Sequence, residues 1–233
     1  MRQPLHKHIN KLFLPLPWLF FDMSKDDMLP APPSCADIDV RWLPMLTGAL
    51  SITFNRPAKK NALRSQSYHE LSQALDFASS CPHVACVIIT GSGDYFTAGA
   101  DLQDDVIGQF EAPCDVMALP VSRFFRSLIE CSVPVIACVQ GPAVGVGVTL
   151  LLLCDAVYSS SAATFWTPFA RSGLAPEFAS ALLFPAAMGN TAASEMILCS
   201  KKMSAADAAA CRLVGAVFTP SRYAWFTITT NSL

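Results

Sequence analysis

The segments Ala98-Gly99-Ala100-Asp101-Leu102 and Gly141-Pro142-Ala143-Val144-Gly145-Val146-Gly147 decide the fold of this chain. Each follows an apolar run with the composition of a buried strand, residues 85–90 before the first and residues 134–139 before the second. Each also leads toward a stretch of helical character, so both can present backbone N–H groups at the N-terminal end of a helix. Two such groups aimed at one point stabilise an oxygen atom that becomes negatively charged. The pattern predicts an α/β domain with an oxyanion hole.

The composition sets limits on the kind of protein. A chain of 233 residues is long enough for one large domain with a substantial core. Hydrophobic residues make up 52% of the chain, charged residues 15%, and the mean hydropathy is +0.39. We therefore expect part of the apolar surface to face a ligand or other subunits. The net charge of −2 provides no field that would attract nucleic acid or an anionic membrane, so neither is predicted as a partner.

One long apolar run could be mistaken for a membrane span. Residues 131–154 contain no charged side chain and are long enough to cross a bilayer. Pro134 and the break at Gln140-Gly141-Pro142 divide this run into a β-branched strand and a Leu-rich helix. We predict a buried strand, a loop and a core helix, and no membrane span.

The nine cysteines show no CxxC spacing. Several lie within apolar runs, which favours buried, reduced thiols, and a disulfide or metal role is the alternative. The histidines have no partners at metal-ligand spacing either, so no metal site is predicted.

The two ends of the chain differ from its centre. Basic residues precede an apolar stretch at 12–21 that two prolines interrupt, a pattern open to a signal or transit peptide or to a disordered extension. A Pro-rich linker follows at 29–34. We assign residues 1–40 to this extension and linker, 41–220 to the domain, and 221–233 to an atypical short tail. The tail is uncharged after Arg222 and β-prone.

Alternating periodicities predict an α/β domain. The expected strands are 50–54, 84–90, 135–139, 156–159 and 164–166, and the expected helices are 65–79, 116–131, 146–154, 178–188, 191–198 and 204–212.

Further motifs extend the pattern on both sides of the two glycine-containing segments. They are Asn55-Arg56-Pro57, Lys60-Asn61-Ala62-Leu63, Cys154-Asp155-Ala156 and Ala175-Pro176-Glu177. Over about residues 46–220 the whole set resembles the crotonase (enoyl-CoA hydratase/isomerase) superfamily, above all its Δ3,Δ2-enoyl-CoA isomerase branch. The resemblance implies a crotonase spiral of ββα repeats with surrounding helices. It also implies an acyl-CoA thioester substrate, no cofactor beyond the coenzyme A of that substrate, a homotrimer, and a peroxisomal or mitochondrial location.

The resemblance also assigns roles to residues. The oxyanion-hole donors would be the N–H groups of Ala100 and Val146. The residues expected to bind the substrate are Lys59, Ala62, Ala98, Gly99, Ala100, Asp101, Leu102, Gly145 and Phe169. Phe169 would line the acyl pocket, with core packing as the alternative. Because the chain has no strong overall charge, the phosphates of coenzyme A would be met locally, by side chains such as Arg56, Lys59 and Lys60. Capping and backbone contacts account for Asp101 and Asp155 without a catalytic role.

Glu177 is the candidate catalytic base. It is the only ionisable side chain between Arg171 and Glu195, and its neighbours are apolar. Burial of such a carboxyl raises its pKa, which suits a group that takes up a proton and returns it. The alternative is a residue at the N-terminus of the helix expected at 178–188, favoured there by the helix dipole. The resemblance supports the first interpretation, because the isomerase glutamate falls at this position.

The chain departs from its relatives in informative ways. Hydratases of the superfamily use two glutamates, which would fall at Thr149 and Phe169, so water addition is not expected. One base is sufficient to move a double bond. Phe178 occupies a position where many relatives carry Gly, and the chain ends in Asn-Ser-Leu where they continue with helices. We therefore expect an enoyl-CoA isomerase in fatty-acid β-oxidation. The alternative is a catalytically inactive binding module or a truncated isoform, and no clear targeting signal is present.

Overall fold

The structure is a computed structural model that describes residues 29–44, 46, 48–104, 115, 118–219 and 221. The expected N-terminal extension at 1–28 and nearly all of the expected tail at 221–233 lie outside these residues.

The fold is organised around a six-stranded sheet with the order β1-β2-β3-β4-β6-β9. Its strands are β1 (Ile38–Trp42), β2 (Ala49–Phe54), β3 (Cys86–Gly91), β4 (Val135–Val139), β6 (Ala156–Ser160) and β9 (Ala216–Phe218). Strand β1 is antiparallel to β2, and every other neighbouring pair is parallel. Parallel strands require crossover connections, and these carry the helices.

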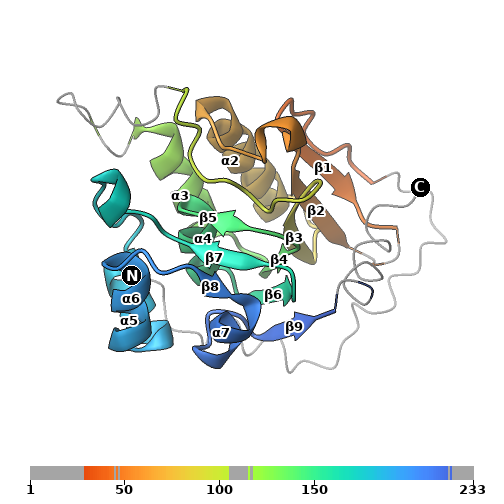
Figure 1. Ribbon diagram of the computed structural model, residues 1–233. Coiled ribbons are helices and arrows are strands. Elements are labelled where there is room, and N and C mark those ends of the chain that lie inside the picture. The colour runs from red at the N-terminus through yellow and green to blue at the C-terminus, as the bar shows by residue number, and fades with distance from the viewer. Residues whose placement is uncertain are drawn as a thin grey trace.

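A second, smaller sheet crosses in front of the first in Figure 1. It contains β5 (Ala143–Val144), β7 (Thr164–Trp166) and β8 (Met203–Ser204) in the order β5-β7-β8. In chain order, β4 of the large sheet is followed by β5 of the small sheet and a helix, and β6 is followed by β7 and further helices. This order forms successive ββα units, which is the spiral expected from the sequence.

Helices cover the sheets in two groups. Helix α2 (Ser65–Ser80) packs against α3 (Pro120–Glu130), and α5 (Ser180–Met188) packs against α6 (Asn190–Ile197) at the lower left of Figure 1. The others are α4 (Val146–Thr149), α7 (Ala205–Ala210) and the 3-10 turns η2 (Pro57–Lys59), η5 (Leu150–Leu153) and η6 (Ala170–Ser172).

The expected strands and helices are found, with shifted ends. The apolar run at 131–154 divides as predicted into a strand, a loop and a helical segment, of which only Val146–Thr149 is α-helical. The helix expected at 116–131 begins at Pro120, and residues 116–117 lie outside the described part. Strand β1 was not expected: it begins at Ile38, inside the segment assigned to the extension, and pairs with β2 from Ile38 to Trp42.

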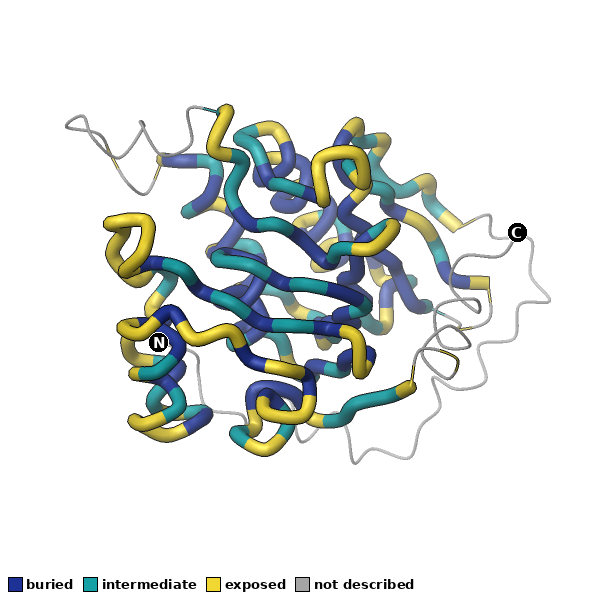
Figure 2. Tube along the Cα trace, viewed as in Figure 1, coloured by how far each residue is buried: buried dark blue, intermediate teal, exposed yellow. Residues whose placement is uncertain are grey.

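The core lies on both faces of the large sheet. Val87 and Ile89 of β3 belong to the main cluster with the helices, while Ile88 belongs to a small cluster with Leu43, Ala49 and Cys138 on the opposite face. Burial on both faces explains why β3 is apolar from Cys86 to Ile89 instead of alternating. Figure 2 shows the buried strands at the centre and exposed loops at the periphery.

Two further expectations concern membrane-spanning helices and the cysteines. Within the described part of the chain, no helix is long and apolar enough to cross a membrane. The described cysteines form no disulfide. Burial raises the pKa of the Cys138 thiol to about 12, whereas Cys199, expected in a buried run, is exposed after α6.

Candidate active site

The two glycine-containing segments lie side by side. A parallel bridge joins Thr97 to Ala143, and the N–H of Val144 donates a 3.0 Å hydrogen bond to the carbonyl of Thr97. A second bridge joins Ala100 to Leu63, so the first loop is held between the second loop and the chain that leads into α2. The structure thus brings together residues that are far apart in the sequence.

Both proposed donors are oriented away from these contacts. The backbone of Leu63 bonds to the residues on either side of Ala100. Its carbonyl accepts from the N–H of Asp101, and its N–H donates to the carbonyl of Gly99, each at 2.8 Å. The N–H of Ala100 therefore points to the opposite side. Val146 is the first residue of α4, where an N–H has no partner within the helix. Neither N–H has an acceptor among the residues that the structure describes.

Glycine is required at specific points of these loops. A Cβ on Gly99 would lie 2.9 Å from the carbonyl oxygen of Val144, and the φ of Gly99 is +89°. Gly145 has φ of +55° and ψ of −119°, a region that L-residues avoid, and a Cβ there would meet no atom within 4 Å. A Cβ on Gly147 would lie 2.3 Å from Cγ2 of Thr97. Close approach to the backbone of Val144 explains Gly99, contact with the side chain of Thr97 explains Gly147, and conformation explains Gly145.

Buried polar side chains fix the loops from behind, and sequence reasoning missed most of them. The hydroxyl of Thr97 donates to the carbonyl of Asn61 at 2.6 Å and accepts from the N–H of Gly99 at 3.1 Å. The side-chain amide of Asn61 donates to the carbonyls of Ser92 and Tyr95. Gln140 donates to the carbonyls of Gly91 and Tyr95. A lone Thr or Gln between apolar residues gives no signal for such roles, because the partners are distant in sequence.

The charged residues near the first loop pair with one another. The guanidinium of Arg56 donates to Asp101 at 3.0 Å and to the carbonyl of Ala62. Although burial opposes ionisation, hydrogen bonds from Arg56 and from the N–H of Gln103 hold the pKa of Asp101 below its usual range. Asp37 is similarly paired, with two hydrogen bonds from Arg64.

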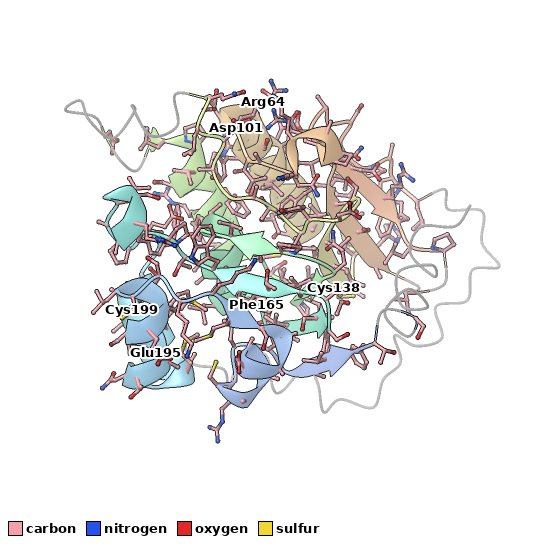
Figure 3. All side chains as sticks on the ribbon, in the orientation of Figure 1. Arg64, Asp101, Cys138, Phe165, Glu195 and Cys199 are labelled. Carbon is pink, nitrogen blue, oxygen red and sulfur yellow. The ribbon has the colours of Figure 1, made fainter. Side chains whose placement is uncertain are left out.

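The pairing of Arg56 with Asp101 corrects one expectation. Arg56 was expected to meet the phosphates of coenzyme A, but its guanidinium is held by Asp101 and is only 17% exposed. Lys59 and Lys60 remain exposed, and Lys60 lies over the ring of Tyr95. Asp101 was expected to cap a following helix, and the residues after Asp104, where that helix would lie, are outside the described part of the chain. The carboxylate of Asp101, labelled in Figure 3, accepts from the N–H of Gln103 two residues on.

The other residues expected to bind substrate divide into two sets. Ala62, Ala98, Gly99 and Gly145 lie in or against the paired loops. Leu102 follows the first loop and is exposed, and Phe169 is buried in the main cluster. The carbonyl of Phe169 accepts from Leu174, so this residue also shapes the turn that leads toward Glu177. As expected, Asp155 satisfies the backbone, accepting from the N–H of Val135 at 2.9 Å.

Glu177 lies in the connection between η6 and α5 and is half-buried. Burial raises the pKa of its carboxyl to about 7. The helix begins only at Ser180, so the alternative of a helix N-terminal residue is wrong. The reason is the backbone of Phe178 and Ala179, whose φ angles of +53° and +54° cannot continue a right-handed helix.

The two left-handed residues after Glu177 are unusual because neither is glycine. This conformation costs an ordinary residue about 1–2 kcal/mol. The ring of Phe178 stacks on Phe125 of α3, with centroids 3.2 Å apart and planes inclined by 8°. The contact removes apolar surface of both rings from water, which is favourable. The stack therefore offsets part of the strain.

The stack continues into the core as a row of four aromatic rings. Phe125 contacts Phe124 at 5.0 Å, and Phe124 contacts Tyr68 of α2 at 6.0 Å between ring centroids. Burial and the negative charges of Glu177 and then Asp104 raise the pKa of Tyr68. Asp104 in turn accepts from the N–H of Ser65 at the start of α2. Glu177, Tyr68 and the end of the first loop are therefore electrostatic neighbours.

The two positions of the hydratase glutamates carry no carboxyl group. Thr149 is fully buried, and its hydroxyl donates to the carbonyl of Val146. Phe169 is 5% exposed. Among the described residues, no group of three or more His, Cys, Asp and Glu side chains could hold a metal ion. The candidate catalytic residues therefore offer one carboxyl group, that of Glu177, and two backbone N–H groups without acceptors among the described residues.

The ββα spiral, with two adjoining backbone loops at a helix start, defines a protein of the crotonase class. The enoyl-CoA hydratase/isomerase family matches residues 46–223, and the chain belongs to this family.

Relatives refine the position of the chain within the family. It is 44% identical over 178 residues to Enoyl-CoA delta isomerase 2 of Rattus norvegicus, covering 76% of this chain and 45% of the relative. It is 43% identical over 180 residues to "Enoyl-CoA delta isomerase 3, peroxisomal" of Mus musculus, covering 76% of this chain and 56% of the relative. The chain thus spans about half the length of these curated relatives. These similarities support the isomerase branch.

Other relatives widen the comparison. Chromodomain Y-like protein of Homo sapiens is 31% identical over 194 residues, covering 80% of this chain and 31% of that protein. Among solved structures, an enoyl-CoA hydratase/isomerase from Pseudoalteromonas atlantica T6c has a TM-score of 0.74 and 36% identity, covering 84% of this chain and 75% of the other. The crotonase fold expected from the sequence is therefore confirmed.

Proposed function

We propose that this chain moves the double bond of a 3-enoyl-CoA thioester to give the trans-2-enoyl-CoA, using Glu177 as the single base. The observation that carries the proposal is the combination of two N–H groups without acceptors, on Ala100 and Val146, with one half-buried carboxyl whose pKa is raised to about 7. No second carboxyl occupies the positions at which hydratases require one. The names of two isomerase relatives support the same reaction.

The mechanism follows from where charge develops. The Glu177 carboxylate takes a proton from C2 of the thioester, and the electron pair of that C–H bond passes to the carbonyl oxygen. The N–H groups of Ala100 and Val146 stabilise the resulting dienolate, and loss of one such donor costs about 3 kcal/mol. The protonated Glu177 then returns the proton at C4, and the double bond forms between C2 and C3. Proton and charge balance without a cofactor.

A carboxyl with a pKa near 7 suits both steps. It is ionised often enough near neutral pH to accept a proton, and it is acidic enough when protonated to give the proton back. The paired loops would bind the thioester end of the substrate through Ala98, Gly99 and Gly145. Exposed Lys59 and Lys60 are available for the phosphates of coenzyme A.

The test is a direct assay of product identity. Purified protein given 3-hexenoyl-CoA is expected to produce trans-2-hexenoyl-CoA, and crotonyl-CoA is expected to remain unhydrated. Glu177→Gln should lower kcat by about two to four orders of magnitude, the scale for loss of a general base. Glu195→Gln is the control, because Glu195 lies on α6 in a surface pair with Lys201. Full activity of Glu177→Gln would remove this residue from the mechanism, and rapid hydration would overturn the isomerase assignment.

A second candidate is an acyl-CoA-binding module without turnover. The observation that favours it is the similarity to Chromodomain Y-like protein, in which the matching region is only about a third of the protein. This candidate predicts binding of acyl-CoA without conversion of 3-hexenoyl-CoA. The same assay, combined with a binding measurement, separates the two. The peroxisomal name of one relative supports a peroxisomal or mitochondrial location for either function, and a homotrimer stays a prediction.

A further inference from the structure

Phe178 directly follows the proposed base and occupies a backbone conformation that favours glycine. An aromatic ring at such a position is not explained by local conformational preference, since a β-branched or bulky residue with positive φ is an outlier. Ala179 repeats the conformation, so the ring is placed by two consecutive left-handed residues. The backbone of this connection turns the ring of Phe178 inward.

The ring meets a prepared surface on α3. It lies face to face with Phe125, which is 5% exposed, and Phe125 rests on the fully buried Phe124. Tyr68 of α2 completes the row, packed against Phe124. We call Tyr68, Phe124, Phe125 and Phe178 the aromatic wall. Three members are core residues of α2 and α3, so the wall rests on elements that cannot move independently of the core.

One residue of the aromatic wall, Tyr68, also interacts electrostatically with Glu177. The charge of Glu177 acts on the buried Tyr68, while Phe178 is the next residue after Glu177. If the N–H groups of Ala100 and Val146 hold the thioester oxygen and Glu177 reaches C2 and C4, the atoms beyond C4 must pass Glu177. Phe178 is the next residue along the chain, and its ring lies against Phe125 of α3. An aromatic ring backed by a packed core cannot be displaced as a flexible side chain can.

We infer that Phe178, stacked on Phe125, is a specificity-determining residue that limits the acyl chain and restricts the substrate to short-chain 3-enoyl thioesters. The inference rests on the proposed function for the position of the double bond. Phe178→Gly removes the ring and should therefore open the aromatic wall and admit longer acyl chains. Glycine also suits the left-handed backbone at this position.

The experiment compares two chain lengths in three variants. For wild-type protein, Phe178→Gly and Phe178→Ala, kcat/KM is measured with 3-hexenoyl-CoA and 3-dodecenoyl-CoA. Both variants are expected to raise the ratio of dodecenoyl to hexenoyl kcat/KM by about tenfold or more, the scale on which pockets discriminate chain length. Phe218→Ala is the control, because Phe218 lies on β9 against the small cluster on the opposite face of the large sheet. An unchanged ratio in both folded Phe178 variants would overturn the inference.

A binding measurement separates this inference from the reaction itself. Calorimetry with butanoyl-CoA and dodecanoyl-CoA, which have no double bond to move, reports the length of the pocket without turnover. A shift of about tenfold or more in favour of dodecanoyl-CoA in Phe178→Gly would support the wall even if wild-type protein converts no 3-enoyl-CoA. Conversion of 3-hexenoyl-CoA with unchanged binding ratios would leave the isomerase proposal intact and refute the wall. Phe178→Ala decides the question if the glycine variant does not fold.

Discussion

The candidate site combines two kinds of segment that are held in place differently. One kind is the paired loops at 96–100 and 142–146, and the other is the Glu177 segment at 174–179. The loops are joined by a β-bridge and supported by the hydrogen bond between Thr97 and Asn61. Their close approach requires glycine at position 99. In the Glu177 segment residues 174–176 are exposed, and two residues other than glycine are left-handed. The proposed oxyanion donors therefore lie in loops that are fixed by backbone contacts, and the proposed base and Phe178 lie in a connection whose conformation depends on side-chain packing.

The strongest test of this contrast is Gly99→Ala. The added Cβ would lie 2.9 Å from the carbonyl oxygen of Val144 in a left-handed conformation, so the two loops must separate. We expect kcat with 3-hexenoyl-CoA to fall by about two to three orders of magnitude, the effect of losing an oxyanion donor. Gly173→Ala is the matched control, because Gly173 is also left-handed but has nothing within 4 Å. Equal kcat in Gly99→Ala and wild type would show that the loops need not adjoin.

The second test uses pH and addresses the segment that carries Glu177. A base with a pKa of about 7 is only about 1% ionised two units below that value. We therefore expect kcat to be about a hundredfold lower at pH 5 than on a plateau above pH 8. A flat profile between pH 5 and pH 9 would contradict a base of this kind.

The pH dependence of the free energy of unfolding is an independent check on the raised pKa of Glu177. The folded pKa of Glu177 is raised above its ordinary value of 4.5, so folding favours the protonated form. This contribution is fully present below about pH 4.5 and is lost as pH rises through about 7. Glu177→Gln should therefore be more stable than wild type by about 2 kcal/mol at pH 8, with little difference at pH 4. Urea unfolding at both pH values measures the two differences.

Thr97→Val tests the support behind the loops. Valine keeps the shape of the side chain but leaves the buried N–H of Gly99 and the carbonyl of Asn61 without the hydroxyl. We expect a loss of about 1–3 kcal/mol in the free energy of unfolding. Thr219→Val should change stability by less than about 0.5 kcal/mol, because the hydroxyl of Thr219 is exposed. If the two losses were alike, Thr97 would not be a support of the loops.

The paired loops were easier to predict than the connection that carries Glu177. The family resemblance placed the donors at Ala100 and Val146, and the glycines around them reflect local backbone requirements. The pairing of Arg56 with Asp101 joins residues that lie on separate loops, and a charged residue in isolation is equally consistent with phosphate binding. The left-handed Phe178 could not be predicted, since its conformation depends on a ring of α3 and opposes its own preference. Strand β1 was missed because it forms by pairing with β2, a contact that the local sequence of β1 does not reveal.

The smallest effect concerns Ala179, the second left-handed residue and the N-cap of α5. Ala179→Gly removes a conformational strain of about 1–2 kcal/mol and adds about 0.4–1 kcal/mol of chain entropy to the unfolded state. We expect a net gain of about 0.5–1 kcal/mol in the free energy of unfolding, measured by urea denaturation. Ala186→Gly, at an exposed position inside the same helix, should instead lose about 1 kcal/mol. If Ala179→Gly destabilised the protein as much as Ala186→Gly, the backbone after Glu177 would not be strained, and the contrast between the two regions would rest on side chains alone.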